Sequence, residues 1–115
     1  MKDERERAQT QTARNVAALE HEQRGEWDAA VELYEANVAE GFTGDWPYMR
    51  LALLYTRRGQ AAEVVRVFER GVEVFQALPR SSPLRASRLR AFRQQLKEAR
   101  RAEAPVRRAR RTAGT

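Results

Sequence analysis

The chain has no cysteine and only one histidine among its 115 residues. Disulfide bonds, a thiol nucleophile and cysteine-ligated zinc or iron–sulfur clusters are therefore excluded, and so is a metal site built from several histidines. Aromatic residues make up only 8% of the sequence. The hydrophobic share of 42% can fill the core of one small domain but leaves little room for a buried active site. We predict neither a metal nor a cofactor.

Long apolar runs are missing as well. Residues 1–7 contain no apolar segment of the kind found in secretory signals, and no later stretch is apolar for long enough to span a bilayer. We therefore expect a cytoplasmic protein without a membrane segment.

Residues that carry catalysis are equally scarce. His21 is the only side chain of the type that ordinarily exchanges a proton near neutral pH. A lone histidine without an arranged nucleophile or an orienting partner satisfies none of the geometric roles of an active site. Gly41 and Gly44 lack the lysine that follows in a phosphate-binding loop. We predict that His21 is a packing residue and that the protein is not an enzyme.

The charge is divided unevenly along the chain. Residues 1–79 carry 10 basic and 14 acidic side chains, whereas residues 80–115 carry 12 basic and 2 acidic ones. A mildly acidic body is thus followed by a strongly basic end. Such an asymmetry indicates that the basic end meets an anion, which is nucleic acid, an acidic protein or the chain's own body.

Hydrophobic spacing predicts helices and no strand. Trp27, Ala30, Tyr34 and Val38 follow the three-to-four-residue period of one helix face, and similar patterns recur on either side of glycines. We predict an all-α fold of about five antiparallel helices. We predict a charged lead-in at residues 1–11, which is a frayed helix or disordered, followed by two helical hairpins at residues 12–78. A basic helix at residues 82–103 and a disordered arginine-rich tail at residues 104–115 complete the predicted organisation.

The two hairpins repeat at a spacing of 34 residues. This shift aligns Gly25 with Gly59, and Tyr34 with Phe68. A helix–turn–helix unit that recurs at this period is typical of the tetratricopeptide repeat. Each unit has an apolar face that it buries only by stacking on a neighbour.

Residues 12–78 therefore resemble two tetratricopeptide repeats, at about 12–44 and 45–78. Each repeat of the family consists of two helices. The residue types of the first helix are found in the second copy here, at Tyr48, Leu51, Ala52 and Tyr55. The residue types of the second helix are found in the first copy, at Trp27, Ala30 and Tyr34. The family pattern is broken where a tyrosine, a small residue and an alanine are usual, at His21, Asn37 and Val64. The resemblance implies an α-solenoid whose last exposed face is covered by the basic helix as a cap.

The resemblance also implies a function as an adaptor. The first helices of such repeats line a concave groove that holds an extended peptide or a helix. The corresponding positions here are Thr12, Asn15, Leu19, Glu22, Gln23, Trp46, Met49, Leu53, Thr56 and Arg57. The expected partner is another protein or a second copy of this chain, because two repeats are fewer than the three that such arrays usually need for stability.

The basic end predicts an alternative function of a different class, association with nucleic acid. Arginines would contact phosphates without sequence preference, because no aromatic side chains interleave with the arginines of the tail. Docking to an acidic protein and simple solvation of the helix are the other interpretations. The candidate contacts are Arg90, Arg93, Lys97, Arg101, Arg107, Arg108, Arg110 and Arg111.

Overall fold

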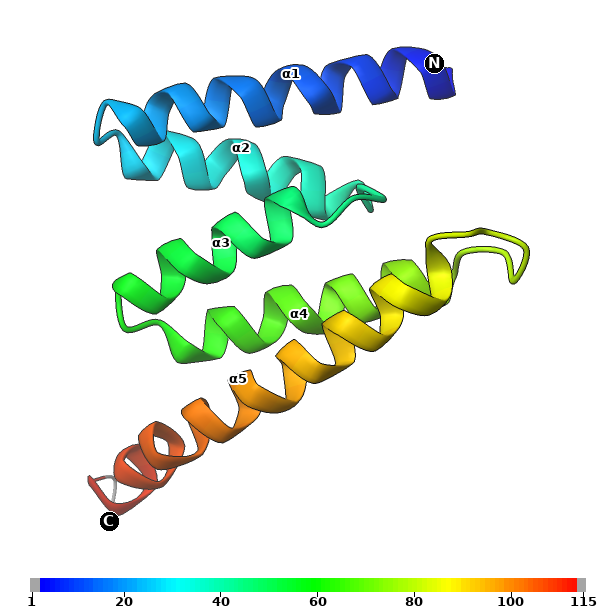
Figure 1. The fold of residues 1–115 in the computed structure, drawn as a ribbon. Helices are drawn as coiled ribbons and strands as arrows, with labels where there is room; N and C mark the ends of the chain where they lie inside the picture. Colours follow the sequence, from blue (N-terminus) through cyan, green and yellow to red (C-terminus); the bar gives the residue numbers. More distant parts are fainter. Residues whose placement is uncertain (1–2, 114–115) are drawn as a thin grey trace.

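A computed structural model describes residues 3–113, which form five α-helices and no strand. The helices are α1 (Glu4–Gln23), α2 (Trp27–Ala39), α3 (Trp46–Arg57), α4 (Ala61–Gln76) and α5 (Arg85–Ala113). Each helix packs against the next one along the chain, so that they stack in order from α1 to α5, and α5 runs obliquely across the end of the stack (Figure 1). The predicted all-α, antiparallel arrangement is confirmed.

The turns after α1 and α3 share one backbone geometry. Gly25 and Gly59 have φ angles of 73° and 71°, in the left-handed region that glycine adopts without steric cost. In each turn the residue after the glycine donates its N–H to the carbonyl five residues earlier, at 2.8 Å in the first turn and 2.9 Å in the second. This bond closes a helix C-terminus in the Schellman motif. The turn after α2 has the same geometry, with Gly41 at a φ of 76° and the N–H of Phe42 bonded to the Asn37 carbonyl at 3.0 Å.

Alanine at Gly25 or at Gly59 is expected to lower the free energy of unfolding by roughly 1–2 kcal/mol, which is the cost of a left-handed residue that has a Cβ atom. A Cβ built at either position meets no atom within 4 Å, so the backbone conformation alone carries the cost. Urea unfolding of the two variants should give equal losses. Unequal losses would show that the two turns are not energetically equivalent.

The core continues through the whole stack. Tyr34, Tyr48, Phe75 and Phe92 are all buried. The ring of Phe92, from α5, lies 5.4 Å from that of Tyr48 and 5.0 Å from that of Phe75, between centroids. A Cβ on Gly71 of α4 would lie 2.7 Å from the Phe92 ring, so this glycine makes room for α5. The last helix is therefore packed into the core.

Helix α5 differs from its prediction. The sequence predicted a helix at 82–103 and a disordered tail at 104–115, but one helix runs from Arg85 to Ala113. Pro105 lies inside it, where proline removes a backbone donor and usually ends a helix. Glu103 and Arg107 form an ion pair at 2.8 Å that spans the proline on one side of the helix. Residues 114 and 115 lie outside the described range.

The N-terminal lead-in is also largely helical. Residues 1–11 were predicted to form a frayed helix or to be disordered, and they are helical from Glu4 onward. Residues 1 and 2 lie outside the described range. Asp3 caps this helix, since its carboxylate accepts the backbone N–H of Glu6 at 2.8 Å. The side chains of residues 3–9 are exposed, and Gln11 is the first described residue to be buried.

Candidate interaction surfaces

The positions predicted to line a groove lie on α1 and α3. Trp46 and Met49 are 41% and 38% exposed, and Leu19 and Leu53 are half-buried. The sequence prediction omitted Val16, which is 54% exposed and precedes Leu19 by one turn of α1. We refer to Val16, Leu19, Trp46, Met49 and Leu53 as the α1/α3 face. The more polar positions Thr12, Gln23, Thr56 and Arg57 are exposed on the same two helices.

Glu22 is buried and supports this face from within. Its carboxylate accepts the Tyr34 hydroxyl at 2.6 Å and the Arg50 Nε at 3.1 Å. A second Arg50 nitrogen donates to the other carboxylate oxygen. The Arg50 guanidinium carbon also lies 5.7 Å from the centre of the Trp46 ring. Glu22 was predicted to meet a partner, but its oxygens instead join α1, α2 and α3.

The contacts of Glu22 keep it ionised. Burial alone would raise its pKa, but hydrogen bonds from Arg50 and Tyr34 and the charges of Arg50 and Arg57 outweigh burial and lower the pKa. Burial and the hydrogen bond to Glu22 raise the pKa of Tyr34 to about 12. Tyr34 is therefore a protonated donor, and Glu22 a charged acceptor, at neutral pH.

Asn15, which was predicted to line the groove, takes part in a hydrogen-bond network with the buried Asn37. The buried Asn37 donates to the Asn15 Oδ1 and to the Gln11 carbonyl, both at 2.8 Å. Arg14 donates to the Asn37 Oδ1 at 3.1 Å, which gives the buried amide a partner for its oxygen as well. Asn37 stands where the tetratricopeptide pattern has a small residue. Here a satisfied polar network fills that place and fastens α1 to α2.

His21 is half-buried, and its Nδ1 lies 3.0 Å from a carboxylate oxygen of Glu26 in the following turn. Within the described residues, His, Cys, Asp and Glu side chains form no group of three or more that could hold a metal ion. The contacts of His21 are those of a residue that ties a helix end to a turn.

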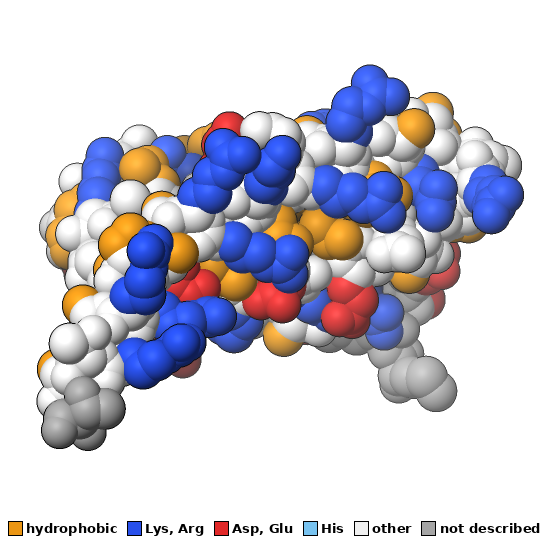
Figure 2. Space-filling model, turned by 90° about the horizontal axis from the view of Figure 1, so that it is seen from below, with side chains coloured by type: hydrophobic (Ala, Val, Ile, Leu, Met, Phe, Trp, Pro, Cys, Tyr) orange, Lys and Arg blue, Asp and Glu red, His pale blue; other side chains and the backbone are white. Residues whose placement is uncertain are grey.

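A second surface lies on α5. Arg90, Arg93, Lys97, Arg101 and Arg108 recur every three, four or seven residues, so they lie along one side of the helix, and all are exposed. We refer to these five as the outer α5 face. No described carboxylate lies within ion-pair distance of any of them. Figure 2 views the molecule from the α5 end of the stack and shows Lys and Arg side chains along its whole length, with fewer acidic ones among them.

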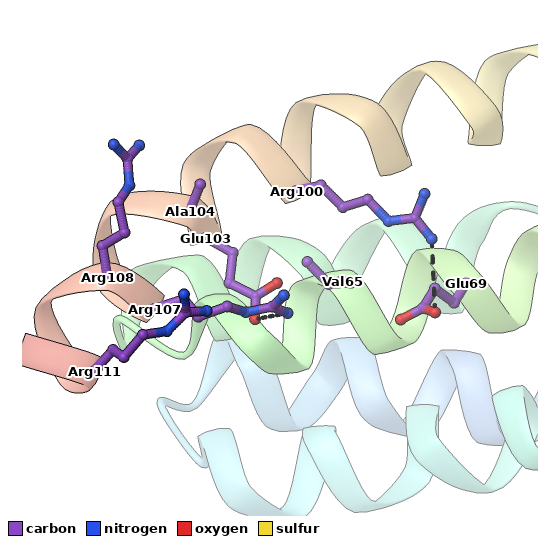
Figure 3. Close-up of a pocket in the computed structure, with 8 residues that line it drawn as sticks. All are labelled: Val65, Glu69, Arg100, Glu103, Ala104, Arg107, Arg108 and Arg111. Carbon is purple, nitrogen blue, oxygen red and sulfur yellow. Dashed lines mark hydrogen bonds and ion pairs between the residues drawn. The ribbon is translucent and has the colours of Figure 1, made fainter. Parts of the chain in front are cut away.

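The other predicted polyanion contacts are placed differently. Arg107 pairs with Glu103 and, with Arg111, borders a hollow of about 490 Å³ between α4 and α5. Arg108 also borders this hollow, although Figure 3 shows its guanidinium group pointing away from Arg107 and Arg111, while Arg100 reaches Glu69 at 3.8 Å on α4. Arg110 follows Arg108 by two residues, roughly 200° around the helix, which places it on the opposite side.

No protein-family model matches the chain, and neither a curated protein nor a solved structure matches it. The resemblance to tetratricopeptide repeats thus stays a prediction from residue types and period. Within residues 3–113, no helix combines the length and the apolar content that crossing a membrane requires.

Proposed function

We propose that this protein is a non-enzymatic interaction module, built from tetratricopeptide-like repeats, that binds an amphipathic helix or an extended peptide on the α1/α3 face. The observation that carries the proposal is the exposure of Val16, Trp46 and Met49 on the two helices that Glu22 and Arg50 join. Single exposed apolar side chains are ordinary, but a group on one face is typical of a binding surface. Aromatic residues and methionine are also enriched at interfaces.

The arrangement of the face supports the same proposal. Trp46, Met49 and Leu53 follow each other at three and four residues, so they present one ridge along α3. Beneath it, the ion pair between Glu22 and Arg50 holds α3 to α1. A surface that is ordered before binding loses less conformational entropy when a partner arrives.

Selection from a displayed library of helical peptides against the full chain tests this function. We expect enriched peptides to carry apolar residues at helical spacing. Trp46→Ala and Met49→Glu should each weaken binding about tenfold or more, as expected for residues at the centre of an interface. Leu84→Glu, which changes an equally exposed apolar residue (43%) outside this face, is the matched control and should leave the affinity unchanged.

Amide chemical shifts of the full chain then locate the bound peptide. Shifts concentrated in α1 and α3 support the proposal, whereas shifts confined to α4 and α5, or an equal loss with Leu84→Glu, contradict it. Light scattering on the same variants identifies a second copy as the partner if the chain is a dimer that Met49→Glu converts into a monomer.

A further inference from the structure

Most of the ion pairs that join different helices or their capping residues run in one direction along the stack. In five of them an arginine of a later element pairs with a carboxylate of an earlier one: Arg50 with Glu22, Arg58 with Asp28, Arg66 with Glu35, Arg88 with Asp45, and Arg100 with Glu69. The exceptions are Arg14, which pairs with Glu40, and His21 and Arg24, which both lie within ion-pair distance of Glu26 at the start of α2. Because no described helix follows α5, the cations on its far side have no such partner.

This pattern separates charge along the molecule. Residues 3–40 carry a net charge of −6, residues 45–76 a net charge of +1, and residues 77–113 a net charge of +10. Two arginines of α5, Arg88 and Arg100, pair with carboxylates of earlier elements. The outer α5 face keeps its full charge, and Arg93, Lys97 and Arg101 also border a hollow of about 610 Å³ beside Val72 of α4.

The outer α5 face is a row along a packed helix, with Arg108 beyond Pro105 and the other four residues before it. At 1.5 Å per residue, Arg90 and Arg101 are about 17 Å apart along the axis. Four of the five side chains are arginines, whose planar guanidinium groups match phosphate oxygens in a two-pronged geometry. Duplex nucleic acid offers a comparable row, with one phosphate charge for about every 1.7 Å of its axis.

We propose that the outer α5 face binds the phosphate backbone of double-stranded nucleic acid without preference for base sequence. The only aromatic residue of α5, Phe92, is buried under α4, so this helix offers no ring that could stack on an unpaired base. Single-stranded sites usually combine cations with such rings. A duplex, whose backbone is the accessible part, fits a surface made only of cations.

An anionic membrane fits this surface less well. A basic helix that lies on a bilayer inserts its apolar side between lipids. The apolar side of α5, with Leu89, Phe92 and Leu96, is buried in the core. The cations therefore lack the accompanying apolar surface that would anchor the helix in a membrane.

Fluorescence anisotropy with labelled duplexes of roughly 24 base pairs, in two unrelated sequences, tests the proposal on the full chain. Each neutralised phosphate contributes about −0.9 to the slope of log affinity against log salt, so five contacts give a slope of about −4 to −5. The variant Arg93→Gln/Lys97→Gln/Arg101→Gln should make this slope shallower by about 3 and weaken binding at low salt at least tenfold. Both sequences should bind equally.

The matched control is Arg5→Gln/Arg7→Gln/Arg24→Gln, which removes the same charge from exposed positions on and just after α1. We expect it to change the affinity less than threefold. An equal loss in both triple variants would overturn the proposal, because binding would then follow net charge alone. Absence of duplex binding at low salt would overturn it as well.

Two further probes separate other anions. Tighter binding to phosphatidylserine vesicles, or to polyglutamate at equal charge, would overturn the assignment to nucleic acid. Light scattering of the protein alone would do the same if the outer α5 face assembled copies into salt-sensitive oligomers that the α5 triple variant dispersed. Met49→Glu should leave duplex binding unchanged, so the outcome is independent of the function proposed for the α1/α3 face.

Discussion

Replacing Phe92 with alanine is expected to lower the free energy of unfolding by about 3–5 kcal/mol, as for other large aromatic residues removed from a core. The ring lies among those of Tyr48, Phe68 and Phe75, which come from α3 and α4. Its loss leaves a cavity between α5 and the rest of the stack. The midpoint of thermal unfolding should fall by roughly 10–20 °C in a chain of this size. Circular dichroism during heating and in urea measures both quantities.

Val106→Ala on the same helix is the control for this loss. Val106 is 38% exposed, and its truncation should change the free energy of unfolding by less than about 0.5 kcal/mol. Phe92→Leu keeps an apolar side chain in place and should retain part of the lost stability. If Phe92→Ala behaved like Val106→Ala, the packing of α5 against α4 would not contribute to folding as described.

Glu22→Gln is expected to cost about 2–3 kcal/mol at neutral pH, because it removes the charge from a carboxylate that accepts hydrogen bonds from Arg50 and Tyr34. The cost should depend on pH in one direction. The pKa of Glu22 is lower in the folded state, so the folded state binds fewer protons, and the stability from this carboxylate is complete above the ordinary glutamate pKa. It is lost as the pH falls through the lowered value. The difference between wild type and variant should therefore shrink as the pH falls below about 5.

Glu20→Gln provides the comparison, since Glu20 lies on the same helix and is exposed. Its effect should stay within about 0.5 kcal/mol at every pH. Urea unfolding of the three proteins across this pH range measures both effects. A pH-independent loss for Glu22→Gln would mean that the side chain acts through packing and not through its charge.

Much of the fold could be predicted from local patterns. The glycines at 25 and 59 and the helical spacing between them locate the first four helices, because turns and amphipathic faces depend on near neighbours in sequence. The extent of α5 could not be predicted in this way. Pro105 argues locally for an end, whereas the helix continues with Glu103 and Arg107 paired across it. The helix-favouring residues on both sides outweigh one missing donor.

The surfaces were predicted less completely than the fold. The repeat pattern places Trp46 and Met49 among the groove positions, and both are exposed, while their role in binding stays a prediction. The pairing of Glu22 with Arg50 joins residues 28 apart in sequence. It depends on how α3 packs relative to α1, so local sequence patterns do not predict it. For the same reason, composition alone could not separate neutralised arginines of α5, such as Arg88, from those that face outward.

The ion pairs that run in one direction also affect the order in which the two similar hairpins stack. If the hairpins exchanged positions, each residue would take the place of the one 34 positions away. Val16 would then replace Arg50 and Thr56 would replace Glu22, so this ion pair would be lost. The exchange would likewise bring Glu32 opposite Glu69, two like charges, where Arg66 meets Glu35. Misassembly of neighbouring units is a characteristic failure of repeat proteins. The charges therefore distinguish the correct sequence of units from its reversal, which the shared apolar pattern alone does not.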